Sequence, residues 1–179
     1  FVARFMASRR GATRRTGMGI ATLAEMTHAI PGLVISIAFI LAFLKPLPVL
    51  NIALYNTLGI IFLAYLCAFF SVGLKPVSAA FVQLDPALEE AARIAGGGYM
   101  FRMRRIFVPL IAPAAASGAI LVFLTAYNEV TVSALLWSSG NETIGTAMYN
   151  YEDGGYTTLA AAMASITIVA TVLLMVALD

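Results

Sequence analysis

The chain has 179 residues, 61% of them hydrophobic and only 11% charged, with a formal net charge of +2. Soluble domains carry about 25% charged residues, so the composition excludes an ordinary soluble domain and indicates helices embedded in lipid. The small net charge gives no indication of nucleic-acid binding, and the single cysteine, Cys67, excludes an intramolecular disulfide. Because the chain begins on Phe1 and ends in an apolar run, we expect it to be an internal piece of a longer protein.

Four apolar stretches, taken in chain order, are long enough for membrane helices, which need about 20 mostly apolar residues. They cover about 18–44, 52–74, 106–127 and 157–178. Pro31 lies inside the first stretch and predicts a kink, and the Pro-rich segment 45–51 predicts a turn before the second. We therefore expect an all-α fold, a polytopic membrane helix bundle in which 1–179 forms one transmembrane domain.

The basic residues predict the orientation of this bundle. They gather in two segments, which carry Arg4, Arg9, Arg10, Arg14 and Arg15, and Lys75, Arg93, Arg102, Arg104 and Arg105. The loop between the first two spans has only Lys45, and the segment 128–156 has no Lys or Arg. Four spans place both basic segments on the same side, and the positive-inside rule makes that side cytoplasmic.

The segment 75–105, between the second and third spans, predicts a short helix with marked ends. Asp85 can cap free amides, and Pro86 fits the first helical position. Glu89 and Glu90 follow in the first turns, where the helix dipole favours acids, and Gly96 can end the helix in the left-handed conformation. A face of small residues, formed by Ala91, Ala92 and Ala95, suits close approach by another surface. A helix that merely connects two spans at the interface is the alternative interpretation.

An amphipathic turn or two is expected before this helix, over 76–84, at the membrane surface. The three arginines after it, Arg102, Arg104 and Arg105, are expected at the cytoplasmic boundary. Positive-inside placement and contact with lipid headgroups explain these arginines without any protein partner.

The stretch EAARIAGGGYMFRMRRIFVP, which begins at Glu90, resembles the cytoplasmic signature of ATP-binding-cassette (ABC) importer permeases. The matching positions are Glu90, Ala91, Ala92, Gly96, Ile106 and Pro109, with Val108 where Leu is usual. The resemblance implies the helix bundle of a type I ABC importer permease, whose cytoplasmic coupling helix docks into a groove on a separate ATPase. The docking residues would be Asp85, Glu89, Glu90, Ala91, Ala92, Gly96, Ile106 and Pro109.

The same resemblance implies the partners and the location. The partners would be ABC ATPase subunits, a periplasmic or lipid-anchored solute-binding protein, a second permease half or subunit, and membrane lipid. The chain would be a multi-pass protein of the bacterial cytoplasmic (inner) membrane. It contains no GxxxxGK[ST] phosphate loop and no nucleophile spaced from a base. We therefore expect a transport subunit rather than an enzyme, with no cofactor or metal of its own and with ATP used by the partner.

Asn128 and Glu129 are the candidate residues of the solute pathway. A carboxylate at membrane depth costs about 2.5–3.5 kcal/mol on insertion scales, so it usually faces protein or a water-filled cavity. The alternative interpretation is a helix-end acid at the outer interface, between Tyr127 and Trp137 as aromatic belt residues.

The run NEVTVSALLWSSGNETIG, from Asn128, resembles permeases of ferric-iron importers, with Ile144 where Leu is more usual. Importers of polyamines, thiamine, sulfate and phosphonate share this architecture and remain alternatives. A secondary transporter driven by an ion gradient is an alternative of another class, but it needs paired charges within the spans, whose interiors are nearly free of charge apart from Glu129. A membrane scaffold is a third class and leaves the signature spacing unexplained.

Overall fold

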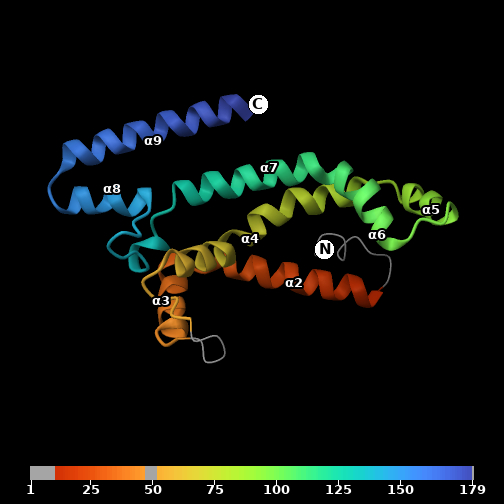
Figure 1. Ribbon diagram of the computed structural model, residues 1–179, viewed down its shortest axis with the longest axis horizontal. Helices are drawn as coiled ribbons and strands as arrows, with labels where there is room; N and C mark the ends of the chain where they lie inside the picture. The colour runs from red at the N-terminus through yellow and green to blue at the C-terminus, as the bar shows by residue number, and fades with distance from the viewer. Residues whose placement is uncertain (1–10, 47–51, 179) are drawn as a thin grey trace. The chain divides into compact units, whose positions relative to one another are not determined.

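The computed structural model describes residues 11–46 and 52–178, and it contains no strand within those ranges. The long helices are α2 (Gly11–Ala29), α3 (Gly32–Phe43), α4 (Leu58–Gln83), α7 (Val108–Tyr127) and α9 (Thr157–Leu178), shown in Figure 1. The shorter elements are α5 (Pro86–Ile94), α6 (Tyr99–Arg102), the π-helical turn η1 (Met103–Phe107), the 3₁₀ turn η2 (Ser133–Leu135) and α8 (Ile144–Asp153). The all-α prediction is confirmed. Arg4, Arg9, Arg10 and most of the predicted turn at 45–51 lie outside the described residues.

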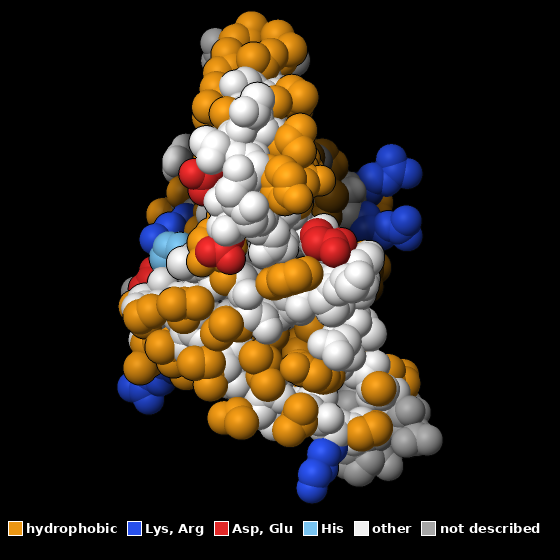
Figure 2. All heavy atoms as spheres, turned by 90° about the vertical axis from the view of Figure 1, so that its left-hand side faces the viewer, with side chains coloured by type: hydrophobic (Ala, Val, Ile, Leu, Met, Phe, Trp, Pro, Cys, Tyr) orange, Lys and Arg blue, Asp and Glu red, His pale blue; other side chains and the backbone are white. Residues whose placement is uncertain are grey.

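Three helical stretches of the described chain are long and apolar enough to cross a membrane. They are Leu58–Gln83, the continuous run Tyr99–Tyr127, and Thr157–Val176. The pair formed by α2 and α3 adds a fourth if it counts as one broken span. Large hydrophobic side chains are exposed along these helices, as expected where lipid rather than water is the solvent. Figure 2 shows one face of the molecule, on which exposed hydrophobic side chains alternate with polar surface.

The first predicted span, 18–44, is not one kinked helix. The chain leaves the helical conformation at Ile30, and Pro31 becomes the N-cap residue of α3 with an extended backbone (φ −56°, ψ 137°). Proline removes a backbone donor and disfavours the helical conformation in the residue before it. At this position both effects end one helix and start another.

The second and third predicted spans have different bounds from those expected. The helix α4 begins at Leu58 rather than near 52 and continues to Gln83, so the separate turn expected over 76–84 is the end of α4. Pro76 is accommodated inside that helix. The third helical run begins at Tyr99 rather than near 106, through α6 and η1.

The π-helical turn η1 comes just before Pro109. Its wider hydrogen bond runs from the amide of Val108 to the carbonyl of Met103. Pro109 has no amide hydrogen, and its ring crowds the carbonyl four residues earlier. A turn with i→i−5 bonding next to a proline keeps the run helical while the regular ladder is interrupted.

The chain forms two compact units, and the first unit contains 11–29 and 69–123 among the described residues. Its centre is a close approach of α4 and α7 (Figure 1): a Cβ added to Gly118 would lie 2.9 Å from the carbonyl oxygen of Gly73 and 3.1 Å from Pro76 Cγ. At the C-terminal end of α4, the ring centroids of Phe81 and Phe107 lie 5.8 Å apart with the ring planes tilted by 44°. Apolar side chains surround this pair, namely Leu74, Val77, Leu84, Met103 and Ile111.

The second compact unit contains 30–46, 52–68 and 124–178 among the described residues. In this unit α3 contacts η2, and α8 contacts both η2 and α9. The segment 128–156 was expected to be a loop, yet it contains η2 and the ten-residue α8. Thr143 starts α8 with a capping box, in which Thr143 and Thr146 each bond the other's backbone amide. The sequence carries only half of the usual signature of this cap, because Thr146 stands where Glu or Gln is typical.

Candidate functional site

The N-terminus of α5 is built as the sequence predicts. Asp85 is the N-cap residue, and its carboxylate accepts a hydrogen bond of 2.8 Å from the amide of Ala87. Pro86 occupies the first helical turn, where its missing amide hydrogen costs nothing. The prediction of the cap is therefore confirmed.

The C-terminus of α5 ends in a Schellman motif. Gly96 has φ of +77°, and its amide donates to the carbonyl of Arg93 at 3.0 Å. The amide of Gly97 donates to the carbonyl of Ala92 at 2.8 Å, which completes the pair of bonds that defines the motif. A Cβ on Gly97 would lie 2.7 Å from that same carbonyl oxygen. The predicted stop at Gly96 is confirmed, and Gly97 is required by close approach.

The residues predicted to dock on a partner are largely accessible. Asp85, Glu90, Ala91 and Gly96 are exposed, while Glu89 and Ala92 are half-buried. Two apolar side chains that the sequence argument did not single out are also exposed, Leu88 at 45% and Ile94 at 89%. Leu88 is spaced from Ala91 and Ala95 so that the three share one face of α5. The short helix thus presents apolar surface with no described residue burying it.

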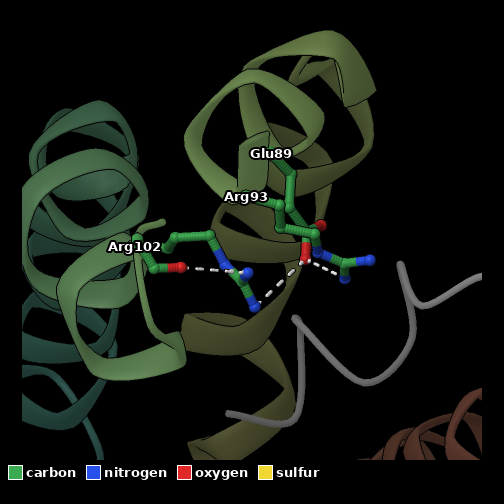
Figure 3. Close-up of polar contacts among 4 residues, drawn as sticks. Glu89, Arg93 and Arg102 are labelled. Atoms are coloured by element: carbon green, nitrogen blue, oxygen red, sulfur yellow. Dashed lines mark hydrogen bonds and ion pairs between the residues drawn. The ribbon is translucent and has the colours of Figure 1, made fainter. Parts of the chain in front are cut away.

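Glu89 lies close to two arginines. Its Oε1 atom lies 2.7 Å from Nη2 of Arg93, one turn later, and 3.8 Å from Nη2 of Arg102 in α6. Arg102 also donates from Nη1 to the carbonyl oxygen of Gly97 at 3.3 Å. Figure 3 shows both guanidinium groups facing the one carboxylate. Sequence reasoning explained Arg102 by the membrane boundary alone and missed this contact.

The last two residues of the signature lie in the helical run after α6. Ile106 is half-buried in η1, and Pro109 is exposed in the first turn of α7. The signature therefore spans the capped helix, the glycine link and the π-helical turn that leads into a membrane-crossing helix. The docking role of these residues stays a prediction.

Glu129, in the second compact unit, is buried, with 8% of its surface exposed. Its Oε1 atom accepts hydrogen bonds from the amide of Val132 and from the hydroxyl of Thr131 at 2.8 Å. Its Oε2 atom accepts from the amide of Ser133 at 3.1 Å and from the hydroxyl of Ser133 at 3.3 Å. The carboxylate thus caps the start of η2, which satisfies two amides that the turn leaves without helical partners. The neighbouring Asn128 is exposed and bonds the carbonyl of Leu124.

The surroundings of Glu129 are polar and tightly packed. Thr143 donates its hydroxyl to Ser133 at 3.2 Å, and the Tyr65 side chain lies near Glu129, Ser133 and Thr143. A Cβ on Gly145 would lie 2.5 Å from the carbonyl oxygen of Glu129. Sequence reasoning missed these supporting residues because they are spread from 65 to 145. The prediction that Asn128 and Glu129 line the solute pathway stays a prediction, and the geometry adds a capping role for Glu129.

Comparison with known proteins decides the family. Residues 1–179 match the family described as "Binding-protein-dependent transport system inner membrane component". The chain belongs to this family. With its membrane-length helices, it is a multi-pass protein of the bacterial inner membrane, as the sequence predicts.

Two of three similar relatives are named for a substrate, and the two substrates differ. The chain is 30% identical over 120 residues, 66% of its length, to the "Probable ABC transporter permease protein y4fN" of Sinorhizobium fredii. It is 27% identical over 129 residues, 72% of its length, to the Fe(3+)-transport system permease protein FbpB 2 of Haemophilus influenzae. It is 33% identical over 98 residues, 52% of its length, to the trehalose/maltose transport system permease protein MalG of Thermococcus litoralis.

This chain covers only part of the length of these relatives, namely 21% of y4fN, 25% of FbpB 2 and 35% of MalG. All three are named as permease proteins of transport systems. Their names support a transport subunit rather than an enzyme for this chain, and they support the ABC importer resemblance.

Proposed function

We propose that the protein containing this chain is the permease of an ABC importer. It provides a membrane pathway for a small solute, and separate ATPase subunits drive its conformational change. A solute-binding protein outside the membrane delivers the solute, and a second permease half or subunit completes the pathway. The segment 75–105 lies on the cytoplasmic side, where the positive-inside rule places its basic residues.

The observation that carries this proposal is the geometry of α5. It is a nine-residue helix with both ends capped, and it lies between two membrane-length helices. A helix this short is marginal in water without tertiary support, yet Leu88 and Ile94 are exposed on it. A short, pre-formed helix whose shared face carries Leu88, Ala91 and Ala95, at spacings of three and four residues, fits a groove on a partner.

Docking is tested by the retention of ATPase subunits on the full-length permease. We expect Glu90→Lys to lower retention by about tenfold, the effect of roughly 1.4 kcal/mol in binding. The matched control is Glu152→Lys, which makes the same charge change at an exposed residue of α8. Equal retention by both variants and the wild type, with unchanged ATP hydrolysis, would remove the docking role.

For the solute, we propose ferric iron. The run from Asn128 resembles ferric permeases, and FbpB 2, a relative named for Fe(3+) transport, matches 72% of the chain. The trehalose/maltose name of MalG supports a different solute, although that match covers 52% of the chain. Phosphonate, polyamine, thiamine and sulfate importers are further candidates of the same architecture.

The ligand retained by the cognate solute-binding protein on purification tests the solute. Bound iron, measured by elemental analysis, supports the proposal. An iron-free binding protein that holds a sugar, a phosphonate or a polyamine overturns the iron assignment and leaves the permease assignment in place. Transport that runs on a proton gradient without ATP would instead favour a secondary transporter.

A further inference from the structure

The position of α5 relative to α6 depends on polar contacts rather than on packing. None of the nine described residues of α5 is buried, so no apolar core fixes the helix against its neighbours. The link between the two helices contains Gly96, Gly97 and Gly98. Added Cβ atoms on Gly96 and Gly98 would meet nothing within 4 Å. The Schellman bonds hold Gly96 and Gly97 against the end of α5, but glycine has the widest backbone freedom of any residue, so Gly98 leaves the angle between the two helices to other contacts.

Arg102, in α6, contacts both the glycine link and α5. Its side chain is only 12% exposed, and its Nε atom is buried without a hydrogen-bond partner in the described part of the chain. One nitrogen bonds the carbonyl of Gly97, inside the glycine link, and another faces Glu89 across it. A largely desolvated guanidinium needs a nearby anion. Glu89, whose side chain is 19% exposed, supplies that anion.

Beyond Arg102 the chain packs against α4. The residues that follow form the π-helical turn η1, and Phe107 in that turn is buried against Phe81 of α4. Arg102 is therefore continuous in sequence with a turn that packs against α4, and it contacts Glu89 of α5, a helix with no buried residue.

We propose that Glu89 and Arg102 are positioning residues of the coupling helix. Their ion pair fixes the angle between α5 and the helical run Tyr99–Tyr127, so that a displacement of α5 by the ATPase moves that run instead of bending the glycine link. The inference rests on the proposed function. It gives Glu89 a role within its own chain, whereas the exposed Glu90 keeps the docking role.

The first test measures the angle directly, in the full-length permease without ATPase. Spin labels at the exposed positions Leu88 and Met100 report the distance between α5 and α6 in a background lacking other cysteines. Glu89→Gln and Arg102→Gln are expected to broaden the distance distribution, because the neutral amides lose the ion pair. Arg102→Lys keeps the charge and is expected to stay close to the wild type. Arg104→Gln is the matched control, since Arg104 is an exposed neighbour in η1.

The second test measures coupling in the complex reconstituted with its ATPases. The probe is the binding protein as purified, with the solute that it carries. We expect Arg102→Gln, which changes a residue outside the predicted docking set, to retain the ATPases, while stimulation of ATP hydrolysis by the binding protein falls about three- to tenfold, an effect within the range of a partly buried ion pair. Arg104→Gln is expected to remain within about twofold of the wild type.

The outcomes separate the two proposals. A wild-type permease that binds no ATPase overturns the proposed function and this inference together. A wild type that binds and couples normally, alongside Glu89→Gln and Arg102→Gln variants with an unchanged distance distribution and unchanged stimulation, overturns only the inference.

Discussion

Ser36 donates its hydroxyl to the carbonyl oxygen of Val132, a residue 96 positions later in the chain. Both residues are buried, Ser36 at 0% exposure and Val132 at 3%. Gly32, one turn earlier in α3, would carry a Cβ only 3.0 Å from side-chain atoms of Thr131 and Val132. The first turns of α3 therefore pack against Thr131 and Val132, at the start of the turn η2 that Glu129 caps.

Removal of the Ser36 hydroxyl should destabilise this contact between α3 and η2. Ser36→Ala leaves the buried Val132 carbonyl without that donor, and we expect a loss of about 1–3 kcal/mol in the free energy of unfolding. Thermal melting of the purified permease in detergent measures the change. Ser165→Ala is the control, because Ser165 is exposed and bonds only a carbonyl of its own helix. Equal melting temperatures for the two variants would contradict the prediction.

Neutralising Glu129 should lower stability as well as transport. Glu129→Gln replaces two acceptor oxygens with one, so at least one of the amides of Val132 and Ser133 loses its partner. The expected cost is about 1–3 kcal/mol, seen as a lower melting temperature, while Glu152→Gln on the exposed side of α8 should change it little. If Glu129 acts only on the solute, the variant will lose transport and melt like the wild type.

Alanine at Gly96, in the Schellman motif that ends α5, should destabilise the helix end more than alanine at Gly98. Gly96 has φ of +77°, so Gly96→Ala should cost about 1 kcal/mol through the left-handed conformation. Gly98 has φ of −63° and open space around it, so Gly98→Ala should be close to neutral. Hydrogen exchange at the Gly97 amide, which donates to Ala92, reads out the change. Faster exchange in both variants alike would argue against a special role for Gly96.

The contact between α4 and α7 should not tolerate a methyl group at Gly118. A Cβ there would lie 2.9 Å from the carbonyl oxygen of Gly73, and backbone cannot move aside as a flexible side chain can. We expect Gly118→Ala to destabilise the protein by about 1–3 kcal/mol. Gly19→Ala in α2, with nothing within 4 Å of its Cβ, should instead stabilise its helix slightly. Melting of the two variants in opposite directions is the expected result.

Several features of the fold follow from local sequence. The cap at Asp85, the proline at 86 and the stop at Gly96 act within a few residues, so α5 was predicted to within one residue of its observed bounds. The last span, 157–178, is uninterrupted and apolar, and it matches α9. Prolines proved harder to interpret, because Pro31 breaks a helix whereas Pro76 and Pro113 are accommodated inside helices. The neighbours of a proline decide between these outcomes, and they are not adjacent in the sequence.

Residue content and local spacing were enough to predict the lipid-embedded helices, the capped helix between two of them, and the family signature around it. Which side chains meet depends on how the chain folds. Arg102 reaches Glu89 across a glycine link, and Thr143 and Tyr65 reach the group around Glu129 from distant positions. Caps and hydrophobic length are set by neighbouring residues, whereas the partners of a buried charge are set by how separate segments pack.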